Sequence, residues 1–80
     1  MKVKVLAFGI AKEIMGGATV ETHLNGEPTV AALKQQLEAT YPKLHELSSY
    51  MVAVNNEYAL PAVVLQTGDE VAIIPPVSGG

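Results

Sequence analysis

Few side chains in this sequence have the types and spacing that carry chemistry. The 80 residues include no cysteine, which excludes a thiolate nucleophile, a disulfide framework and a cysteine-based zinc or iron–sulfur site. The two histidines, His23 and His45, lie far apart and match no metal-ligand spacing, so we expect surface or packing roles. Asp69 and Glu70 are adjacent carboxylates whose side chains point to opposite faces of a strand, so we expect them to shape a turn. The side chains therefore indicate neither a metal site nor an acid–base pair.

The C-terminal residues offer a different kind of chemistry. Pro75 and Pro76 each fix φ and favour an extended backbone, which would project the chain away from the fold. The last four residues, Val77-Ser78-Gly79-Gly80, would reach roughly 13 Å further when fully extended. The two final glycines have no Cβ, so they could thread a narrow channel and bring the terminal carboxylate to a buried reactive centre. The alternative is a frayed terminus without function, which a Gly-Gly pair alone supports at least as well.

The elements that hold this segment follow from the hydrophobic periodicity. Alternating or apolar runs predict five strands, at residues 2–8, 19–24, 51–55, near Tyr58 and at 71–74. Residues 10–15 predict a short helical turn that Gly16-Gly17 ends, and Asn55-Asn56 predicts a turn.

One main helix of about three turns is predicted between the second and third strands. It has Thr29 as N-cap, and Pro42 stops it. Its apolar residues recur at helical spacing, at Val30, Leu33, Leu37 and Tyr41. We expect Leu44 and Leu47 to pin an irregular return segment to the core.

The predicted element order is β-β-α-β-β-β, an α+β pattern. A single helix covers one face of a sheet, and the long helical connection favours a mixed sheet. The pattern therefore predicts a β-grasp, or ubiquitin-like, fold, with a mixed sheet of about five strands on one main helix. We expect residues 1–76 to form this domain and residues 77–80 to form a flexible tail.

The strand alternation also predicts an exposed apolar patch. If Val3 and Val5 face the helix, Phe8 points away from it, as does Ile74 in the last strand. Together with Tyr58 these residues would form a patch near the tail, and such patches often mark partner surfaces. A one-residue slip in register would reverse the assignment, and scattered exposed apolar residues are the alternative.

Composition and charge exclude other classes of protein. Apolar residues make up 49% of the chain and charged residues 16%, which favours a folded domain over a disordered chain. The net charge is −3, the lysines are scattered and arginine is absent, so we expect no nucleic-acid partner. No run approaches the ~20 apolar residues of a membrane span, and the N-terminus has no apolar signal sequence, so we expect no membrane partner and a cytoplasmic location.

Several runs resemble the small subunits of molybdopterin synthase, a family of ubiquitin-like sulfur carriers. The specific run is Gly68-Asp69-Glu70-Val71-Ala72-Ile73-Ile74-Pro75-Pro76-Val77-Ser78-Gly79-Gly80. Supporting matches are Lys4-Val5-Leu6-Ala7-Phe8, Ala11-Lys12-Glu13, Thr29-Val30 with Leu33, and Val52-Ala53-Val54-Asn55. The resemblance covers nearly the whole chain.

The resemblance implies a carrier whose catalytic machinery lies on its partners. A ubiquitin-activating-like adenylyltransferase, using ATP and magnesium, would activate Gly80 as an acyl-adenylate. A sulfur donor system would convert it to a thiocarboxylate. The tail, with Gly79 as the slim residue behind Gly80, would then enter the large synthase subunit and deliver sulfur to a pterin precursor. Phe8, Tyr58 and Ile74 match the family's hydrophobic docking surface, and the chain would bind no cofactor itself.

Two other classes of function remain open. One is a related carrier for thiamine biosynthesis or a ubiquitin-like protein modifier, which shares the fold and the Gly-Gly end. The other is a β-grasp interaction module with an inert tail.

Overall fold

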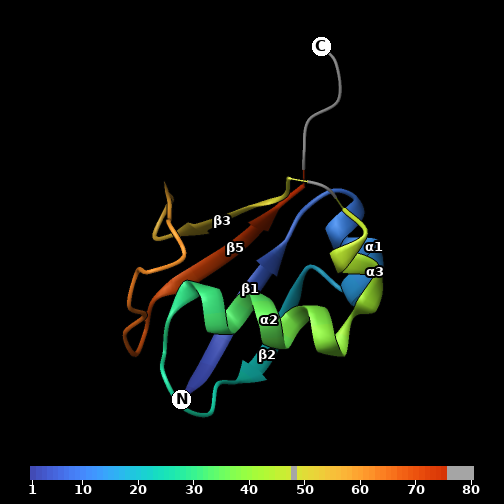
Figure 1. Ribbon diagram of the computed structural model, residues 1–80. Coiled ribbons are helices and arrows are strands. Elements are labelled where there is room, and N and C mark those ends of the chain that lie inside the picture. The colour runs from blue at the N-terminus through green and yellow to red at the C-terminus, as the bar shows by residue number, and fades with distance from the viewer. Residues whose placement is uncertain (48, 76–80) are drawn as a thin grey trace.

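The computed structural model describes residues 1–47 and 49–75, which form one mixed sheet and three helices. The elements are β1 (Lys2–Ala7), α1 (Ile10–Met15), β2 (Thr19–His23), α2 (Val30–Thr40), α3 (Pro42–His45), β3 (Met51–Val54), β4 (Glu57–Tyr58) and β5 (Glu70–Ile74). The strand order is β2-β1-β5-β3-β4. The central pair, β1 and β5, runs parallel and the other pairs are antiparallel (Figure 1). This arrangement is the predicted β-grasp fold.

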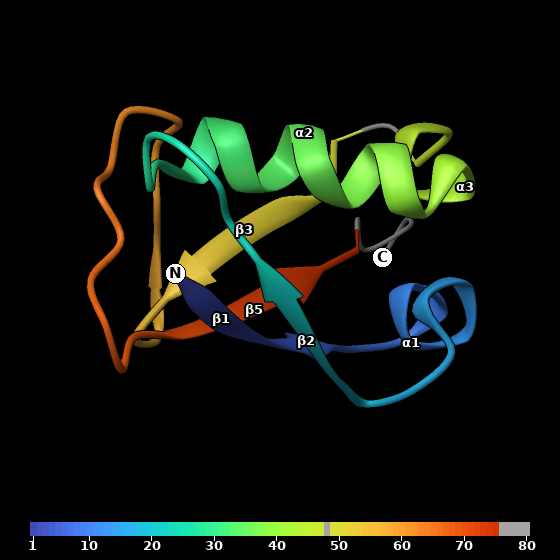
Figure 2. The same cartoon turned by 90° about the horizontal axis from the view of Figure 1, so that it is seen from below.

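Helix α2 lies along one face of the sheet (Figure 2). Its predicted N-cap is confirmed, because the Thr29 hydroxyl accepts a hydrogen bond from the Ala32 N–H at 3.2 Å. The N–H groups of Val30 and Ala31 donate to carbonyl oxygens of the loop before β5, at 3.0 and 2.9 Å. The first turn of α2 is therefore tied to that loop, which fixes the helix over the sheet.

The return from α2 to β3 differs from the prediction. Residues 42–45 are not irregular but form the short helix α3, which starts at Pro42. Tyr41 has φ −124° and ψ 82°, outside the helical region that a following proline disfavours. Proline suits the first position of a helix because an N–H at that position would have no partner within the helix, so its absence costs nothing. Pro42 therefore ends one helix and begins the next, while Leu44 is buried and Leu47 half-buried against the core, as expected.

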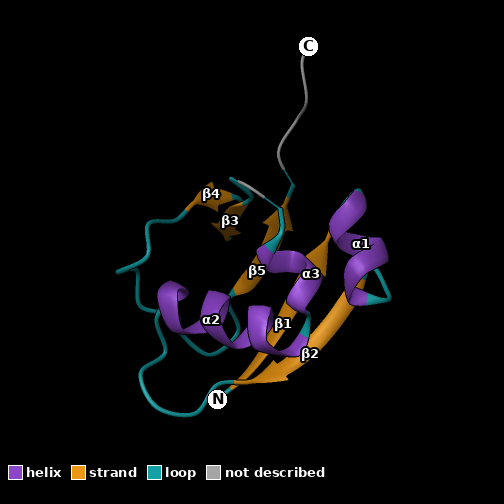
Figure 3. Ribbon diagram, turned by 45° about the vertical axis from the view of Figure 1, so that its right-hand side comes forward, coloured by secondary structure: helices purple, strands orange, loops and turns teal. Residues whose placement is uncertain are grey.

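Figure 3 shows helices α2 and α3 in front of the sheet, and the hydrophobic core lies between these two layers. The sheet contributes alternate residues, and α2 contributes its apolar stripe. The residues with no more than 1% exposure in these two layers are Val5, Val71, Ile73, Val30, Leu33 and Leu37. The predicted register is thus confirmed, since Val3, Val5 and Ala7 face the core.

Strands β3 and β4 form a hairpin with a two-residue turn. Val54 pairs with Glu57, and the intervening Asn55 and Asn56 have φ of 52° and 69°. Asparagine tolerates this left-handed conformation, which tight hairpin turns require. The predicted turn is confirmed, and the strand bounds differ from the predicted ones by no more than one residue where both ends were predicted.

Candidate functional site

The predicted tail continues from the centre of the sheet. Its parent strand, β5, lies between β1 and β3, and both neighbours hold it along its length. Pro75 follows directly after β5 and is the last described residue. Residues 76–80 lie outside the described residues, and with them Pro76, Val77, Ser78, Gly79 and Gly80 of the predicted site and the proposed boundary between residues 76 and 77. The last described residue before the tail therefore follows a strand that is paired on both sides.

The predicted apolar patch surrounds a hollow on the open face of the sheet, away from α2. Its volume is about 320 Å³. We call it the open-face hollow; it is lined by Leu6, Phe8, Ala53, Asn56, Tyr58, Glu70, Ala72 and Ile74. The structure brings together the three predicted docking residues: Phe8 is 51% exposed, Tyr58 is 68% exposed and Ile74 is half-buried.

Cross-strand pairing explains why this face is hollow. Leu6 pairs with Ala72, Ala72 with Ala53, and Ala53 with Tyr58, so one row of side chains crosses four strands. Paired residues project from the same face of a sheet, so two methyl groups form the floor between larger side chains. Ile74, two residues beyond Ala72 on the same face, closes the end next to the tail.

Sequence reasoning did not single out the floor of the hollow. Ala53 and Ala72 are small residues without functional chemistry, and nothing in either strand marks them. Their importance depends on being opposite one another in register, which is a relation between strands. Pairing the two apolar runs in register would have been the only signal.

The far end of β5 is fixed by a hydrogen-bonded turn. The Asp69 carboxylate accepts from the Gln66 N–H at 2.8 Å and from the Asn55 side chain at 3.0 Å. These two hydrogen bonds hold the pKa of Asp69 below its usual range. The Glu70 N–H donates to Asn55 Oδ1 at 3.0 Å. Asp69 therefore shapes the turn, as predicted, and the Glu70 side chain lines the open-face hollow.

A second polar cluster ties α2 to α3 and to the start of β3. The Tyr50 hydroxyl donates to the Glu38 carboxylate, whose other oxygen lies 2.8 Å from His45 Nδ1. The bond from Tyr50, followed by that from His45, lowers the pKa of Glu38. Burial and the Glu38 bond raise the pKa of Tyr50. His45 thus has a structural partner, His23 is exposed, and the described residues contain no group of three potential metal ligands.

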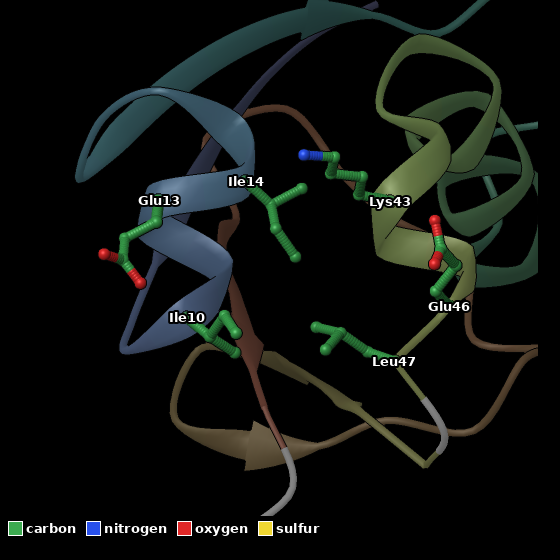
Figure 4. Close-up of a pocket in the computed structure, with 6 residues that line it drawn as sticks. All are labelled: Ile10, Glu13, Ile14, Lys43, Glu46 and Leu47. Atoms are coloured by element: carbon green, nitrogen blue, oxygen red, sulfur yellow. The ribbon is translucent and has the colours of Figure 1, made fainter.

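Another hollow, of about 420 Å³, lies between α1 and α3 (Figure 4). Its apolar side chains are Ile10, Ile14 and Leu47, and charged side chains stand at its rim. None of these residues was predicted to be functional.

In the part of the chain that the structure describes, no helix is long and apolar enough to cross a membrane.

Comparison with known proteins adds to this geometry. The model of the ThiS family matches residues 5–80. The chain is 39% identical over 83 residues to the molybdopterin synthase sulfur carrier subunit of Chlamydomonas reinhardtii, with all of both chains covered.

Solved structures agree with the fold. A putative molybdopterin converting factor subunit 1 from Pyrococcus furiosus is 27% identical and has a TM-score of 0.87, with 96% of this chain and 99% of that chain covered. The small archaeal modifier protein SAMP1 from Haloferax volcanii is 28% identical and has a TM-score of 0.84, with all of both chains covered.

Proposed function

Because the chain belongs to the ThiS family, we propose that it is a sulfur carrier of molybdenum cofactor biosynthesis, acting as the small subunit of molybdopterin synthase. The observation that carries the proposal is the full-length similarity to proteins named as sulfur carrier subunits of that synthase. The chain would not be an enzyme on its own. The proposed chemistry takes place on a main-chain carboxylate, so the catalytic groups would belong to its partners.

The proposed chemistry takes place on the carboxylate of Gly80. A carboxylate is a poor electrophile, so a partner adenylyltransferase would use ATP and magnesium to form an acyl-adenylate and release pyrophosphate. A sulfur donor system would then displace AMP and leave a thiocarboxylate. The two final glycines would let this group enter a narrow active site. Inside the large synthase subunit, the sulfur would pass to the pterin precursor and form part of the dithiolene.

The open-face hollow is proposed as the docking site for the large subunit. It lies on the one sheet face that α2 leaves open, and its end at Ile74 is adjacent in sequence to Pro75, the last described residue before the tail. Exposed aromatic and branched apolar side chains around a hollow supply the kind of contact that dominates binding energy. Docking there would hold the start of the tail against the partner that receives the sulfur.

A second candidate function is protein modification. It is favoured by the structural similarity to SAMP1, which is named as a modifier protein. Such a modifier would use the same activated Gly80, but its acyl group would pass to an amine of a target protein. A thiamine-pathway carrier and a β-grasp module with an inert tail are the remaining alternatives.

Intact mass spectrometry tests the proposal. The purified chain is incubated with its adenylyltransferase, ATP, magnesium and a sulfur donor. We expect a mass increase that matches replacement of one oxygen by sulfur. A variant that lacks Gly80 and a variant extended by one residue beyond Gly80 should show no such change, because each lacks the free glycine carboxylate at that position.

Three outcomes separate the synthase carrier, the modifier and the inert module. Sulfur delivery to a pterin precursor with the large subunit supports the proposed synthase role. Stable conjugates to lysine side chains without sulfur delivery favour the modifier. Failure of any cognate enzyme to activate Gly80 contradicts both and leaves the interaction module.

A further inference from the structure

Gly9 and Pro75 meet where β1 and β5 end. A Cβ atom built on Gly9 would lie 3.1 Å from Pro75 Cγ, closer than ordinary van der Waals contact. The parallel pairing of the two strands ends at Ala7 and Ile73, so Gly9 and Pro75 stand two residues further along their respective strands. Proline has no N–H that could extend the ladder of hydrogen bonds to position 75.

The backbone at position 9 also requires glycine. Gly9 has φ 56° and ψ −132°, a combination that residues with a Cβ rarely adopt. This conformation turns the chain directly from β1 into α1: the Phe8 carbonyl accepts from the Ala11 N–H at 3.0 Å, and the Gly9 carbonyl accepts from the Lys12 N–H at 3.1 Å. Gly9 is therefore constrained by its own conformation and, separately, by the proline ring next to it.

We propose that Gly9 is a positioning residue for sulfur transfer: the space left by its missing side chain seats Pro75 and sets the direction in which the tail leaves the sheet. The inference rests on the proposed function, because it assigns a role in delivering Gly80. It concerns Gly9 and Pro75 alone, which lie behind the tail and outside the residues that line the open-face hollow.

The reach of the tail shows why its starting direction matters. Five residues beyond Pro75 span at most ~17 Å. A change of about 10° at Pro75 would displace the end of a fully extended tail by about 3 Å. Reacting atoms must approach to about 3–3.5 Å, and a misplacement of about 1 Å can cost about a hundredfold in rate. A Cβ at position 9 would crowd the Pro75 ring by a few tenths of an ångström, and we expect the backbone at Pro75 to turn in response.

A double-mutant cycle measures this effect. The variants are Gly9→Ala, Pro75→Ala and the combination of the two. Steady-state kinetics of acyl-adenylate formation give kcat and KM, and direct titration without ATP gives the affinity for the adenylyltransferase. We expect Gly9→Ala to lower kcat by about tenfold or more while the affinity stays within about twofold. In the Pro75→Ala background the same substitution should have little further effect, because the ring that it pushes is gone.

Two controls separate positioning from loss of the fold. Gly16 at the other end of α1 also has a positive φ, 81°, but a Cβ there would meet nothing within 4 Å. Gly16→Ala should therefore strain the backbone and leave kcat within about twofold. Pro75→Ala alone leaves Gly9 unstrained, so it folds even if Gly9→Ala does not, and it should lower kcat at unchanged affinity. Unchanged kcat in Gly9→Ala or in Pro75→Ala would overturn the inference, as would an equal loss from Gly9→Ala in both backgrounds.

A distance measurement decides the inference even if the proposed function fails. The chain has no cysteine, so Gln35→Cys on the exposed side of α2 and Ser78→Cys in the tail provide one unique pair for spin labels. We expect Gly9→Ala to shift the distance distribution between the labels, and to shift it little in the Pro75→Ala background. An unchanged distribution overturns the positioning role. Failure of the wild-type chain to be adenylated would instead refute the proposed function.

Discussion

Replacing Phe8 with alanine should weaken docking without unfolding the domain. Phe8 is 51% exposed at the edge of the open-face hollow, outside the core. A phenylalanine side chain presents about 200 Å² of surface, so roughly 100 Å² remains for a partner to cover. At about 25 cal/mol per Å² this area contributes about 2.5 kcal/mol. Alanine retains part of it, so the loss is about 2 kcal/mol, or roughly a 30-fold weaker Kd.

Ile10 offers a closely matched control. It lies two residues away and is 50% exposed, but it lines the hollow between α1 and α3 instead. Isothermal titration calorimetry with the large synthase subunit would compare Phe8→Ala, Ile10→Ala and the wild-type chain. Urea unfolding of the three proteins would measure stability. We expect only Phe8→Ala to weaken binding, and we expect the free energies of unfolding to agree within about 0.5 kcal/mol.

The reasoning is refuted by either of two results. If Phe8→Ala folds normally and binds the large subunit with a Kd within about threefold of wild type, the open-face hollow is not the docking site. If Ile10→Ala weakens binding instead, the partner occupies the hollow between the helices.

Two other substitutions test the hydrogen bonds that fix the strands. Tyr50→Phe removes the donor to Glu38 and should lower the free energy of unfolding by about 2 kcal/mol near neutral pH. The pKa of Glu38 is lowered in the folded state. The stability that its hydrogen bond to Tyr50 contributes is therefore fully present when the pH is above the ordinary pKa of 4.5, and it is lost as the pH falls through the pKa of the folded state. Urea unfolding should therefore show the difference from wild type shrinking at low pH, and a constant difference would exclude the carboxylate as the partner. Asn55→Ala breaks two side-chain hydrogen bonds at a positive φ and should cost about 2 kcal/mol, whereas Asn55→Gly, which loses the same bonds but adopts a positive φ freely, should cost less; equal losses would show that the left-handed backbone at position 55 adds nothing to the cost.

The strands and the main helix could be predicted because their signals are local. The alternation through Val3, Val5 and Ala7 specifies which face of β1 is buried, and Thr29 is followed by apolar residues at helical spacing. The helix α3 could not be predicted in this way. Pro42 is read as a stop signal, but the same residue is a favourable first residue of a helix, and the burial of Leu44 that stabilises this short turn comes from distant parts of the chain.

The residues of the candidate site likewise fall into those that the pattern of a single strand predicts and those that depend on the pairing of strands. Phe8, Tyr58 and Ile74 are large apolar residues on a predicted exposed face, so single-strand patterns were sufficient to select them. The floor at Ala53 and Ala72 depends on the register of two strands, and the contact of Gly9 with Pro75 depends on the parallel pairing of β1 with β5. Relations between strands that are far apart in sequence have no local signature, even where the strands themselves are correctly predicted.

The alternation of β5 assigns the two proposed roles to consecutive residues. At the end of β5, Ile74 lines the open-face hollow and the next residue, Pro75, lies against Gly9. At the end of β1, Phe8 lines the same hollow and the next residue, Gly9, leaves room for the Pro75 ring. Two adjacent residues at the end of each of two parallel strands would therefore combine the proposed docking contact with the proposed contact that directs the tail. Because both contacts lie at the end of the same pair of strands, a partner that binds Phe8 and Ile74 would also fix the position of Pro75. Under the proposed function the reactive group is the main-chain carboxylate of Gly80, so the central strands would position it and the partners would supply the chemistry.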